Sequence, residues 1–322
     1  MRPRVTRVLC LGIAACAAVF ALPVESTRLE HAEGGRQTSS AVARKNKFGS
    51  APKERGHRNE MVIAERLRSD REFRRRFFER LRVPPELFSG VVAEGKTALK
   101  EVDLFCGHVN GKTDMVVQLT EGEPINVSVK MSPSGQVYLV SAAKFAGAYE
   151  ALYGEAIPPD VVRALKLFTG EAEDSAAVLA TISPDVDRAY RRLEQEQNSR
   201  LFYDAIHAYD PHMAEALLTW LRDHAANVFE LCFAAGTVKD RKNWSQVLWY
   251  QNLLEGGEDE IDYLVEIQRV KSALEKLGPR AIVKKGPRGG STIHLPFGAV
   301  QYHLGKLEFR HSMTKIRELL EE

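Results

Sequence analysis

Asp114, Ser128 and Lys130 have the residue types and the spacing that could catalyse phosphodiester hydrolysis. Side chains two residues apart in a strand point to one face, so Ser128 and Lys130 would meet an Asp114 placed at the mouth of the neighbouring strand. A carboxylate can hold Mg²⁺ while the ion keeps water and contacts phosphate. A lysine can orient or deprotonate the attacking water and stabilise the developing negative charge. An Asp at a strand start and a Lys on an exposed strand are also common surface residues, so the spacing leaves both interpretations open.

A predicted β-hairpin would position these three side chains. Residues 115–119 and 125–131 are Val-rich runs with two-residue alternation, and the turn-forming run 121–124 separates them. This pattern is typical of two antiparallel strands. Asp114 precedes the first strand, and Lys130 lies near the end of the second.

The run 112–114 (Lys-Thr-Asp), the hairpin and the run 128–130 (Ser-Val-Lys) resemble the core of the PD-(D/E)xK nuclease superfamily, specifically its restriction-endonuclease-like members. In that family an Asp precedes a hairpin whose second strand carries Asp or Glu, any residue and Lys, and these groups bind Mg²⁺ and activate water on DNA. The resemblance implies that Asp114 binds the metal ion and that Lys130 is catalytic. It also implies an α/β fold with a restriction-endonuclease-like mixed core sheet flanked by helices. Ser128 stands where the family has its second acid.

The second metal-binding carboxylate would therefore come from elsewhere or be absent. In restriction-endonuclease-like proteins a helix before the core sheet often supplies a Glu, and this chain has Glu60 near the start of a predicted helix over residues 59–83. The resemblance makes Glu60 the first candidate for a catalytic and metal-binding role. Glu150, on a predicted helix over residues 140–153, is the alternative. A Glu near a helix N-terminus is also favoured by the helix dipole alone.

Four residues are candidates for DNA contacts. Gln136 lies in a predicted polar turn after the hairpin, and Arg288, His303 and Arg310 lie in a predicted small antiparallel sheet near the C-terminus. Gln can read an adenine edge, and cationic side chains can hold a DNA groove. The predicted helix over residues 59–83 is also rich in arginine, which suits either solvent or a phosphate backbone. The formal net charge is only +2, so any nucleic-acid surface must be a local patch.

Composition divides the 322-residue chain into five parts. Residues 1–24 form an apolar leader, and residues 25–57, which are poor in large apolar residues, are predicted to be a disordered basic linker. The resemblance implies that residues 58–156 form the nuclease core, and residues 157–278 are predicted to be mostly helical. Residues 279–322 would form a β-hairpin and a helix that could contact DNA.

One aromatic group inside the predicted helical region has two interpretations. Trp244, Trp249 and Tyr250 lie close to the charged run 239–242. Such a group can stack on bases, and it can equally belong to the core.

The leader bears on the cellular compartment. It has a basic start, an apolar run over residues 8–22 and small residues near Ala21, which is the shape of a secretory signal peptide. The run is short for a membrane span, so we expect no membrane for the mature chain. A translation start further downstream is another explanation of the segment. Cys106 and Cys232 lack metal-site spacing and indicate buried thiols in a reducing compartment. We therefore expect a cytoplasmic protein, with export as the alternative.

Together these features predict a Mg²⁺-dependent endonuclease that hydrolyses phosphodiester bonds of double-stranded DNA, of the type II restriction kind. Ser128 would hydrogen-bond the attacking water or a ligand. The partners would be double-stranded DNA and a cognate DNA methyltransferase, and symmetric cleavage of both strands calls for a homodimer. A catalytically inactive DNA-binding or interaction protein on the same fold is one alternative, and an exported protein of unknown role is another.

Overall fold

The computed structural model describes residues 52–93, 111–183, 198–254 and 261–321, and all of them belong to one compact unit of the chain. The predicted leader over residues 1–24 and Cys106 lie outside the described residues. The predicted linker over residues 25–57 is described only from residue 52 onward, where the chain is already helical. The linker prediction is therefore wrong at its C-terminal end.

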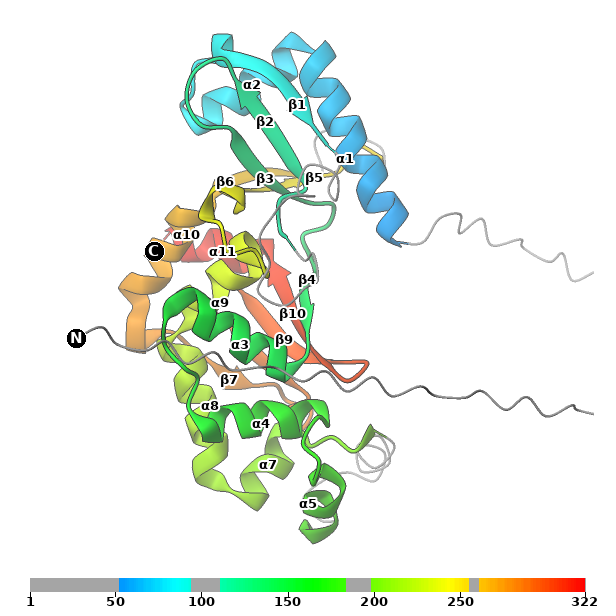
Figure 1. Ribbon diagram of the computed structural model, residues 1–322, viewed down its shortest axis with the longest axis vertical. Coiled ribbons are helices and arrows are strands. Elements are labelled where there is room, and N and C mark those ends of the chain that lie inside the picture. Colours follow the sequence, from blue (N-terminus) through cyan, green and yellow to red (C-terminus); the bar gives the residue numbers. More distant parts are fainter. Residues whose placement is uncertain (1–51, 94–110, 184–197, 255–260, 322) are drawn as a thin grey trace, which may run out of the picture. The chain divides into compact units, whose positions relative to one another are not determined.

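The first sheet is mixed and carries the predicted hairpin (Figure 1). Its strands, in spatial order, are β1 (Phe88–Val92), β2 (Met115–Leu119), β3 (Ile125–Lys130), β5 (Val247–Gln251) and β6 (Asp262–Glu266). β3 and β5 run parallel, and the other neighbours run antiparallel. β2 and β3 form the predicted hairpin, with Met115 opposite Val127. The predicted α/β class with a mixed core sheet is confirmed.

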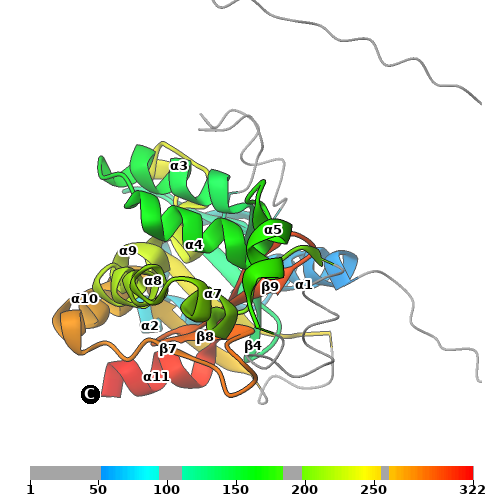
Figure 2. The same cartoon turned by 90° about the horizontal axis from the view of Figure 1, so that it is seen from below.

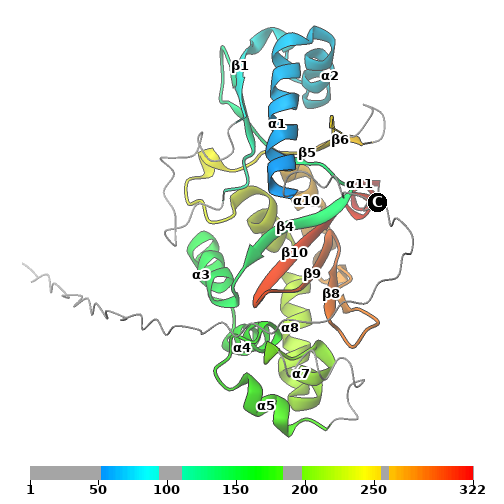
Figure 3. The same ribbon diagram turned by 90° about the vertical axis from the view of Figure 1, so that its right-hand side faces the viewer.

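The second sheet is antiparallel throughout and joins the C-terminal strands to one strand from the predicted core. Its order is β4 (Ser134–Val140), β10 (Lys306–Ser312), β9 (Gly298–His303), β8 (Thr292–Leu295) and β7 (Lys284–Lys285), and Figure 3 shows β4, β10, β9 and β8 side by side. The predicted C-terminal antiparallel element is confirmed. The predicted turn at Gln136 is wrong, because Gln136 lies in β4 opposite Arg310.

Helices flank both sheets. α1 (Pro52–Ser69) and α2 (Arg71–Leu81) precede the first sheet, and α10 (Ile267–Leu277) and α11 (Met313–Glu321) follow β6 and β10. The insertion between β4 and β5 contains α3 (Ala142–Tyr153), α4 (Pro159–Thr169), α5 (Ser175–Thr181), α7 (Tyr203–Tyr209), α8 (Pro211–Asp223), α9 (Ala225–Glu230) and a π-helical turn over Leu231–Ala235. Short 3₁₀ turns cover Pro85–Leu87, Arg241–Asn243 and Gly278–Arg280. α4 packs against both α3 and α8 (Figure 2).

The prediction of a mostly helical region over residues 157–278 is wrong for β5 and β6. Every residue of β5 is buried, so its run Val-Leu-Trp-Tyr-Gln lacks the alternation of a half-exposed strand. A strand buried on both faces cannot be distinguished from a buried helical segment by periodicity. β5 is nevertheless the parallel neighbour of β3, so the core sheet needs a strand from this region.

The predicted single helix over residues 59–83 is two helices. The Asp70 carboxylate accepts hydrogen bonds from the N–H groups of Glu72 at 2.9 Å and Phe73 at 3.0 Å, which caps the start of α2. Arg82 ends α2 with a positive φ of 56°. The break lets the chain turn, so that α1 and α2 both pack on the first sheet.

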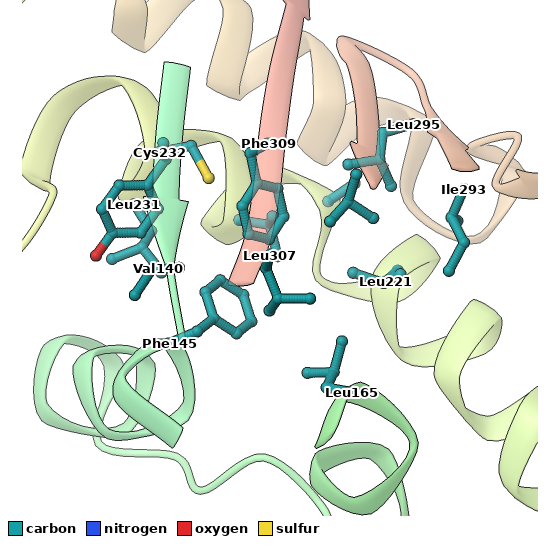
Figure 4. Packing of buried hydrophobic residues seen from close by; sticks show 14 of the residues in the cluster. Val140, Phe145, Leu165, Leu221, Leu231, Cys232, Ile293, Leu295, Leu307 and Phe309 are labelled. Carbon is teal, nitrogen blue, oxygen red and sulfur yellow. The ribbon is translucent and has the colours of Figure 1, made fainter. Parts of the chain in front are cut away.

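Two apolar clusters hold the fold together. In the first, the ring centroid of Trp249 in β5 lies 5.7 Å from that of Phe73 and 4.9 Å from that of Phe77 in α2. In the second, Phe145 of α3 lies 5.1 Å from Phe309 of β10 (Figure 4). Cys232 is buried in the second cluster as a free thiol (Figure 4).

The aromatic group of Trp244, Trp249 and Tyr250 belongs to the core. Their exposed fractions are 6%, 2% and 0%. These rings are therefore packing residues, and base stacking is not open to them.

Candidate active site

Asp114, Ser128 and Lys130 meet at the end of β3 from which the chain enters the second sheet. The Ser128 hydroxyl donates a hydrogen bond to Asp114 Oδ2 at 3.1 Å, and Lys130 Nζ donates one to Ser128 Oγ at 2.7 Å. Lys130 Nζ also lies 3.4 Å from Asp114 Oδ2 and donates to the Val129 carbonyl at 2.9 Å. Ser128 is therefore a neutral bridge between a carboxylate and an ammonium group.

The hairpin register produces this convergence. The Asp114 N–H donates to the Val127 carbonyl at 2.9 Å, and the Val129 N–H donates to Asp114 Oδ2 at 2.8 Å. Val127 and Val129 face the first apolar cluster, so the alternating Ser128 and Lys130 point to the opposite face. The side chains of Lys130 and Asp114 stay 15% and 27% exposed, and a substrate can therefore reach them.

One oxygen of Asp114 stays available. Every hydrogen bond that a described residue donates to the Asp114 carboxylate ends on Oδ2. Oδ1 accepts none within the described part of the chain. This partly exposed oxygen can therefore bind a cation or a water molecule.

The docking of α1 on β5 places Glu60 at the same site. The preceding residue, Asn59, donates from Nδ2 to the Gln251 carbonyl at 2.8 Å and accepts from the Leu253 N–H at 2.9 Å through Oδ1. Asn59 is fully buried, and Glu60 is 9% exposed. The two hydrogen bonds fix this turn of α1 at the end of β5, next to the end of β3.

The electrostatics of Glu60 show its proximity to the other site residues. Burial, and to a smaller extent the negative charge of Asp114, raise the pKa of the Glu60 carboxyl to about 7, whereas His57 and Lys130 act to lower it. His57 Nδ1 lies 3.1 Å from Glu60 Oε2. The other candidate, Glu150, is exposed on α3, and its carboxylate makes no hydrogen bond or ion pair with a described residue. The structure thus brings Glu60, and not Glu150, to Asp114.

The donor set suits a hard divalent cation only in part. Among residues 52–93, 111–183, 198–254 and 261–321, no group of three or more His, Cys, Asp or Glu side chains is placed to hold a metal ion. Mg²⁺, however, is usually bound by one or two carboxylates together with water and substrate phosphate. Asp114 and Glu60 provide two carboxylates whose charges already repel each other. A cation would relieve this repulsion, so the residues present fit Mg²⁺.

Lys112 is a second lysine at the site, and the sequence suggested no role for it. Its side chain is 7% exposed, and Nζ donates to the Val137 carbonyl at 2.8 Å and lies 4.1 Å from the centre of the Tyr138 ring. Burial lowers the pKa of Lys112 to about 7, with a smaller contribution from the charge of Lys130 in the same direction. Lys112 ties the segment before Asp114 to β4.

His311 and Tyr250 lie behind Lys130. Tyr250 is the register partner of Lys130 across β3 and β5, and its ring centroid is 5.3 Å from that of His311 in β10. His311 Nδ1 and the Tyr250 hydroxyl are buried and have no hydrogen-bond partner among the described residues. Burial, then the charges of Lys130 and Arg310, lower the pKa of His311 to about 3. The imidazole is therefore neutral. Nothing in the sequence pairs these distant residues.

The four candidate DNA contacts do not form one cluster. Gln136 and Arg310 face each other across β4 and β10, and Gln136 is exposed. Arg310 Nη1 donates to the buried Glu308 carboxylate at 2.8 Å. Arg288 is exposed in the turn between β7 and β8, and His303 is exposed at the far end of β9. The structure thus brings only Gln136 and Arg310 together.

Most of the arginines of α1 and α2 make contacts within the chain. The contacts are Arg66 to Asp70, Arg68 to the Val91 carbonyl, Arg74 to the Leu67 and Arg68 carbonyls, Arg75 to Glu72 and Glu79, and Arg80 to Asp262. These side chains therefore stabilise helix ends and neighbouring strands. The arginine density of this segment does not by itself indicate a DNA surface.

No helix in the described part of the chain has the length and apolar character needed to cross a bilayer.

No protein-family model and no curated protein matches this sequence. Among solved structures, the chain is similar to the crystal structure of the restriction endonuclease MspI in complex with its cognate DNA. The similarity covers 80% of this chain and 89% of that chain, with 8% sequence identity and a TM-score of 0.44. A likeness at this level does not identify which residues act.

Proposed function

We propose that this chain is a Mg²⁺-dependent endonuclease that cleaves double-stranded DNA, of the type II restriction kind. The observation that carries the proposal is the convergence of Asp114 and Lys130 through Ser128, with the Glu60 carboxylate beside them. Two acids and a lysine at one partly exposed strand end are the groups that metal-assisted phosphodiester hydrolysis uses.

Asp114 and Glu60 would hold the cation. When bound, Mg²⁺ would supply a polarised water and offset charge on the phosphate. Asp114 offers Oδ1, because its other oxygen is occupied by the Ser128 hydroxyl, the Val129 N–H and Lys130. These contacts orient the carboxylate before any ligand binds, which lowers the cost of binding.

Lys130 would position the attacking water and stabilise the negative charge that develops on the phosphate oxygens. Its ammonium group is held by Asp114 Oδ2, Ser128 Oγ and the Val129 carbonyl. A donor that is already fixed where charge develops does not have to reorganise during the reaction. Ser128 acts here as a positioning residue, because its hydroxyl bridges Asp114 and Lys130.

The DNA would lie along the second sheet. β4 begins at Ser134, shortly after Lys130, so a duplex with one phosphate at the site would also reach Gln136 and Arg310. Gln can read an adenine edge, and Arg can read guanine or hold phosphate. We further propose a homodimer for symmetric cleavage, a cytoplasmic location and a cognate DNA methyltransferase as partner.

Digestion of supercoiled plasmid tests this function. The wild-type chain is incubated with unmethylated plasmid in Mg²⁺ and in EDTA, beside Asp114→Asn and the control Asp160→Asn, which changes an exposed aspartate on α4. We expect discrete fragments from the wild type and the control in Mg²⁺, and none from Asp114→Asn or in EDTA. Cleavage that persists in Asp114→Asn would contradict the proposal.

A second function is favoured by the neutral residue at position 128. Ser128 contributes no charge, and no third metal-binding side chain lies with Asp114 and Glu60 in the described residues. A site with a neutral residue at this position and only two carboxylates would suit a protein that binds DNA without cleaving it. It would retard duplex DNA in a gel and cleave none of it in Mg²⁺ or Mn²⁺.

A further inference from the structure

The hairpin between β9 and β10 ends in an exposed leucine with an unfavourable backbone conformation. Leu304 is 77% exposed, and its φ is 48°, followed by Gly305 at 73°. A left-handed conformation suits Gly or Asn in a two-residue hairpin turn and disfavours a branched apolar side chain. The chain therefore places Leu304 where it loses backbone stability and gains no burial. Features that cost stability in this way are typical of functional positions.

The side chains on either side of Leu304 are not held by other side chains in the described part of the chain. His303 and Lys306 pair with each other through the backbones of β9 and β10, but their exposed side chains make no hydrogen bond or ion pair with a residue that the structure describes. Arg74 and Arg75 of α2 and Arg310 of β10 differ, because their side chains bind carboxylates or carbonyls of the chain. The tip thus presents an imidazole, an apolar side chain and an ammonium group in succession.

This combination fits nucleic acid better than protein or lipid. A cation next to an apolar side chain matches a phosphate backbone that flanks stacked bases. A stable protein interface needs about 800 Å² on each partner, and one leucine among polar residues supplies far less apolar surface. A single such side chain would also anchor a membrane only weakly.

β10 connects the tip directly to the candidate active site. Ser312, at the other end of β10, pairs with Ser134 of β4, which follows closely after Lys130. From Lys306 to Ser312 the strand spans about 20 Å at roughly 3.4 Å per residue. Successive base pairs of a duplex are also separated by about 3.4 Å. In a duplex whose axis ran along β10, the tip would therefore lie about six base pairs from a phosphate bound at Lys130.

We propose that Leu304 is a DNA wedge, which enters a groove of the bound duplex and partly separates two base pairs about six steps from the cleaved bond. Lys306 and His303 hold the phosphates on either side. The wedge makes DNA recognition sensitive to how easily that base step unstacks, because flexible steps are opened at a lower cost than stiff ones. The inference rests on the proposed function of the chain as a DNA-cleaving enzyme.

The test replaces Leu304 by a residue that the turn prefers. Leu304→Asn suits the positive φ, so its melting temperature should equal or exceed that of the wild type. The control, Ile282→Asn, removes another exposed apolar side chain, 70% exposed, that lies outside the hairpin. The probes are short duplexes with single 2-aminopurines at successive positions, studied without Mg²⁺ so that the DNA stays intact.

We expect the wild type and Ile282→Asn to raise the fluorescence of 2-aminopurine at one step, because unstacking relieves its quenching. Leu304→Asn should lose this signal and bind about tenfold more weakly. Unchanged affinity and fluorescence in Leu304→Asn, with cleavage intact, would contradict the wedge role of Leu304 and leave the proposed nuclease function standing. Unstacking by a chain that never cleaves DNA would support the wedge and reject the nuclease. Absence of DNA binding would reject both.

Discussion

Ser128 is the residue at which this site departs most from the acid-x-lysine pattern. Its hydroxyl donates to Asp114 and accepts from Lys130, so it links the two groups without adding charge. The negative charge of the site thus comes from Asp114 and Glu60. A carboxylate at position 128 would instead lie fully buried next to Asp114.

Substitution Ser128→Asp should therefore make folding depend on a cation. Two adjacent buried carboxylates repel each other, and we expect the free energy of unfolding in EDTA to fall by on the order of 2 kcal/mol. Mg²⁺ should restore most of the loss, whereas it should change the melting temperature of the wild type less. Differential scanning calorimetry with and without Mg²⁺ measures both effects.

The matched control for this substitution is Ser89→Asp, which places the same charge on an exposed residue of β1. It should show no cation-dependent recovery. A variant Ser128→Asp that is equally stable in EDTA and in Mg²⁺ would show that position 128 does not face the cation.

The raised pKa of Glu60 predicts that the stability of the folded protein depends on pH. Its pKa is raised from 4.5 to about 7, so the folded state favours the protonated carboxyl. The resulting stability is fully present below pH 4.5 and is lost as the pH rises through about 7. Substitution Glu60→Gln removes this loss. In EDTA the variant should gain stability relative to the wild type as the pH rises, with the increase complete above pH 7.

The same group should control the affinity for the cation. Above about pH 7 the Glu60 carboxyl is ionised, so Mg²⁺ affinity should rise through this pH in the wild type and stay flat in Glu60→Gln. Glu65→Gln, an exposed change on the same helix, should behave as the wild type. Calorimetric titration of Mg²⁺ across this pH range measures the affinity of each variant. Identical profiles of affinity against pH for the wild type and Glu60→Gln would exclude Glu60 from the site.

Part of the candidate site could be predicted from the sequence. Asp114, Ser128 and Lys130 were predictable because a hairpin brings nearby residues together by simple alternation. His311 and Lys112 were not, because their places depend on how the second sheet packs on the first. A buried histidine in a distant strand leaves no local pattern that points to Lys130.

Among the elements, the break between α1 and α2 allows both helices to pack on the first sheet. α1 (Pro52–Ser69) is held near its middle by Asn59 and at its C-terminal end by the turn at Asp70, where the Arg66 guanidinium also contacts the Asp70 carboxylate at 3.3 Å. Apolar periodicity continues across this turn, so a single helix was predicted. The capping Asp70 after Ser69 is the local signal for the boundary.

Substitution Asp70→Ala should destabilise the protein without changing its chemistry. Loss of a capping side chain costs about 1 kcal/mol, which urea unfolding monitored by circular dichroism can measure. Ser69→Ala, at the adjacent exposed position, should change stability by less than about 0.5 kcal/mol. Cleavage at 25 °C should persist in both variants, because the Asn59 contacts hold Glu60. An unchanged unfolding midpoint in Asp70→Ala would contradict the capping role.

The strands differ in how far the nearby sequence determines which strand each one pairs with. β2 and β3 are neighbours in sequence, and their turn was evident. β5 joins β3 from far along the chain, and β4 leaves the predicted core to pair with β10. Such long-range pairing is set by tertiary packing, which is why the α/β class was predictable and the membership of each sheet was not.

At the scale of the whole molecule, the candidate site lies where the chain passes from the first sheet to the second. β3 ends at Lys130 and β4 begins at Ser134, and the Met313 N–H closes the passage with a hydrogen bond to the Pro133 carbonyl at 2.7 Å. The first sheet supplies Asp114 and Lys130, and the second offers the strands along which a duplex would lie. With a net charge of only +2, any DNA-binding surface of the molecule has to be a local one.

The role of Lys130 in cleavage is tested by the single-turnover cleavage rate of Lys130→Met, measured together with its DNA affinity. Lys144→Met, an exposed change on α3, is the control. For Lys130→Met we predict a cleavage rate lower by about 100-fold or more and a DNA affinity within about threefold of the wild type, with no effect in the control. A wild-type rate in Lys130→Met, or rate and affinity that fall together by one factor, would contradict this role.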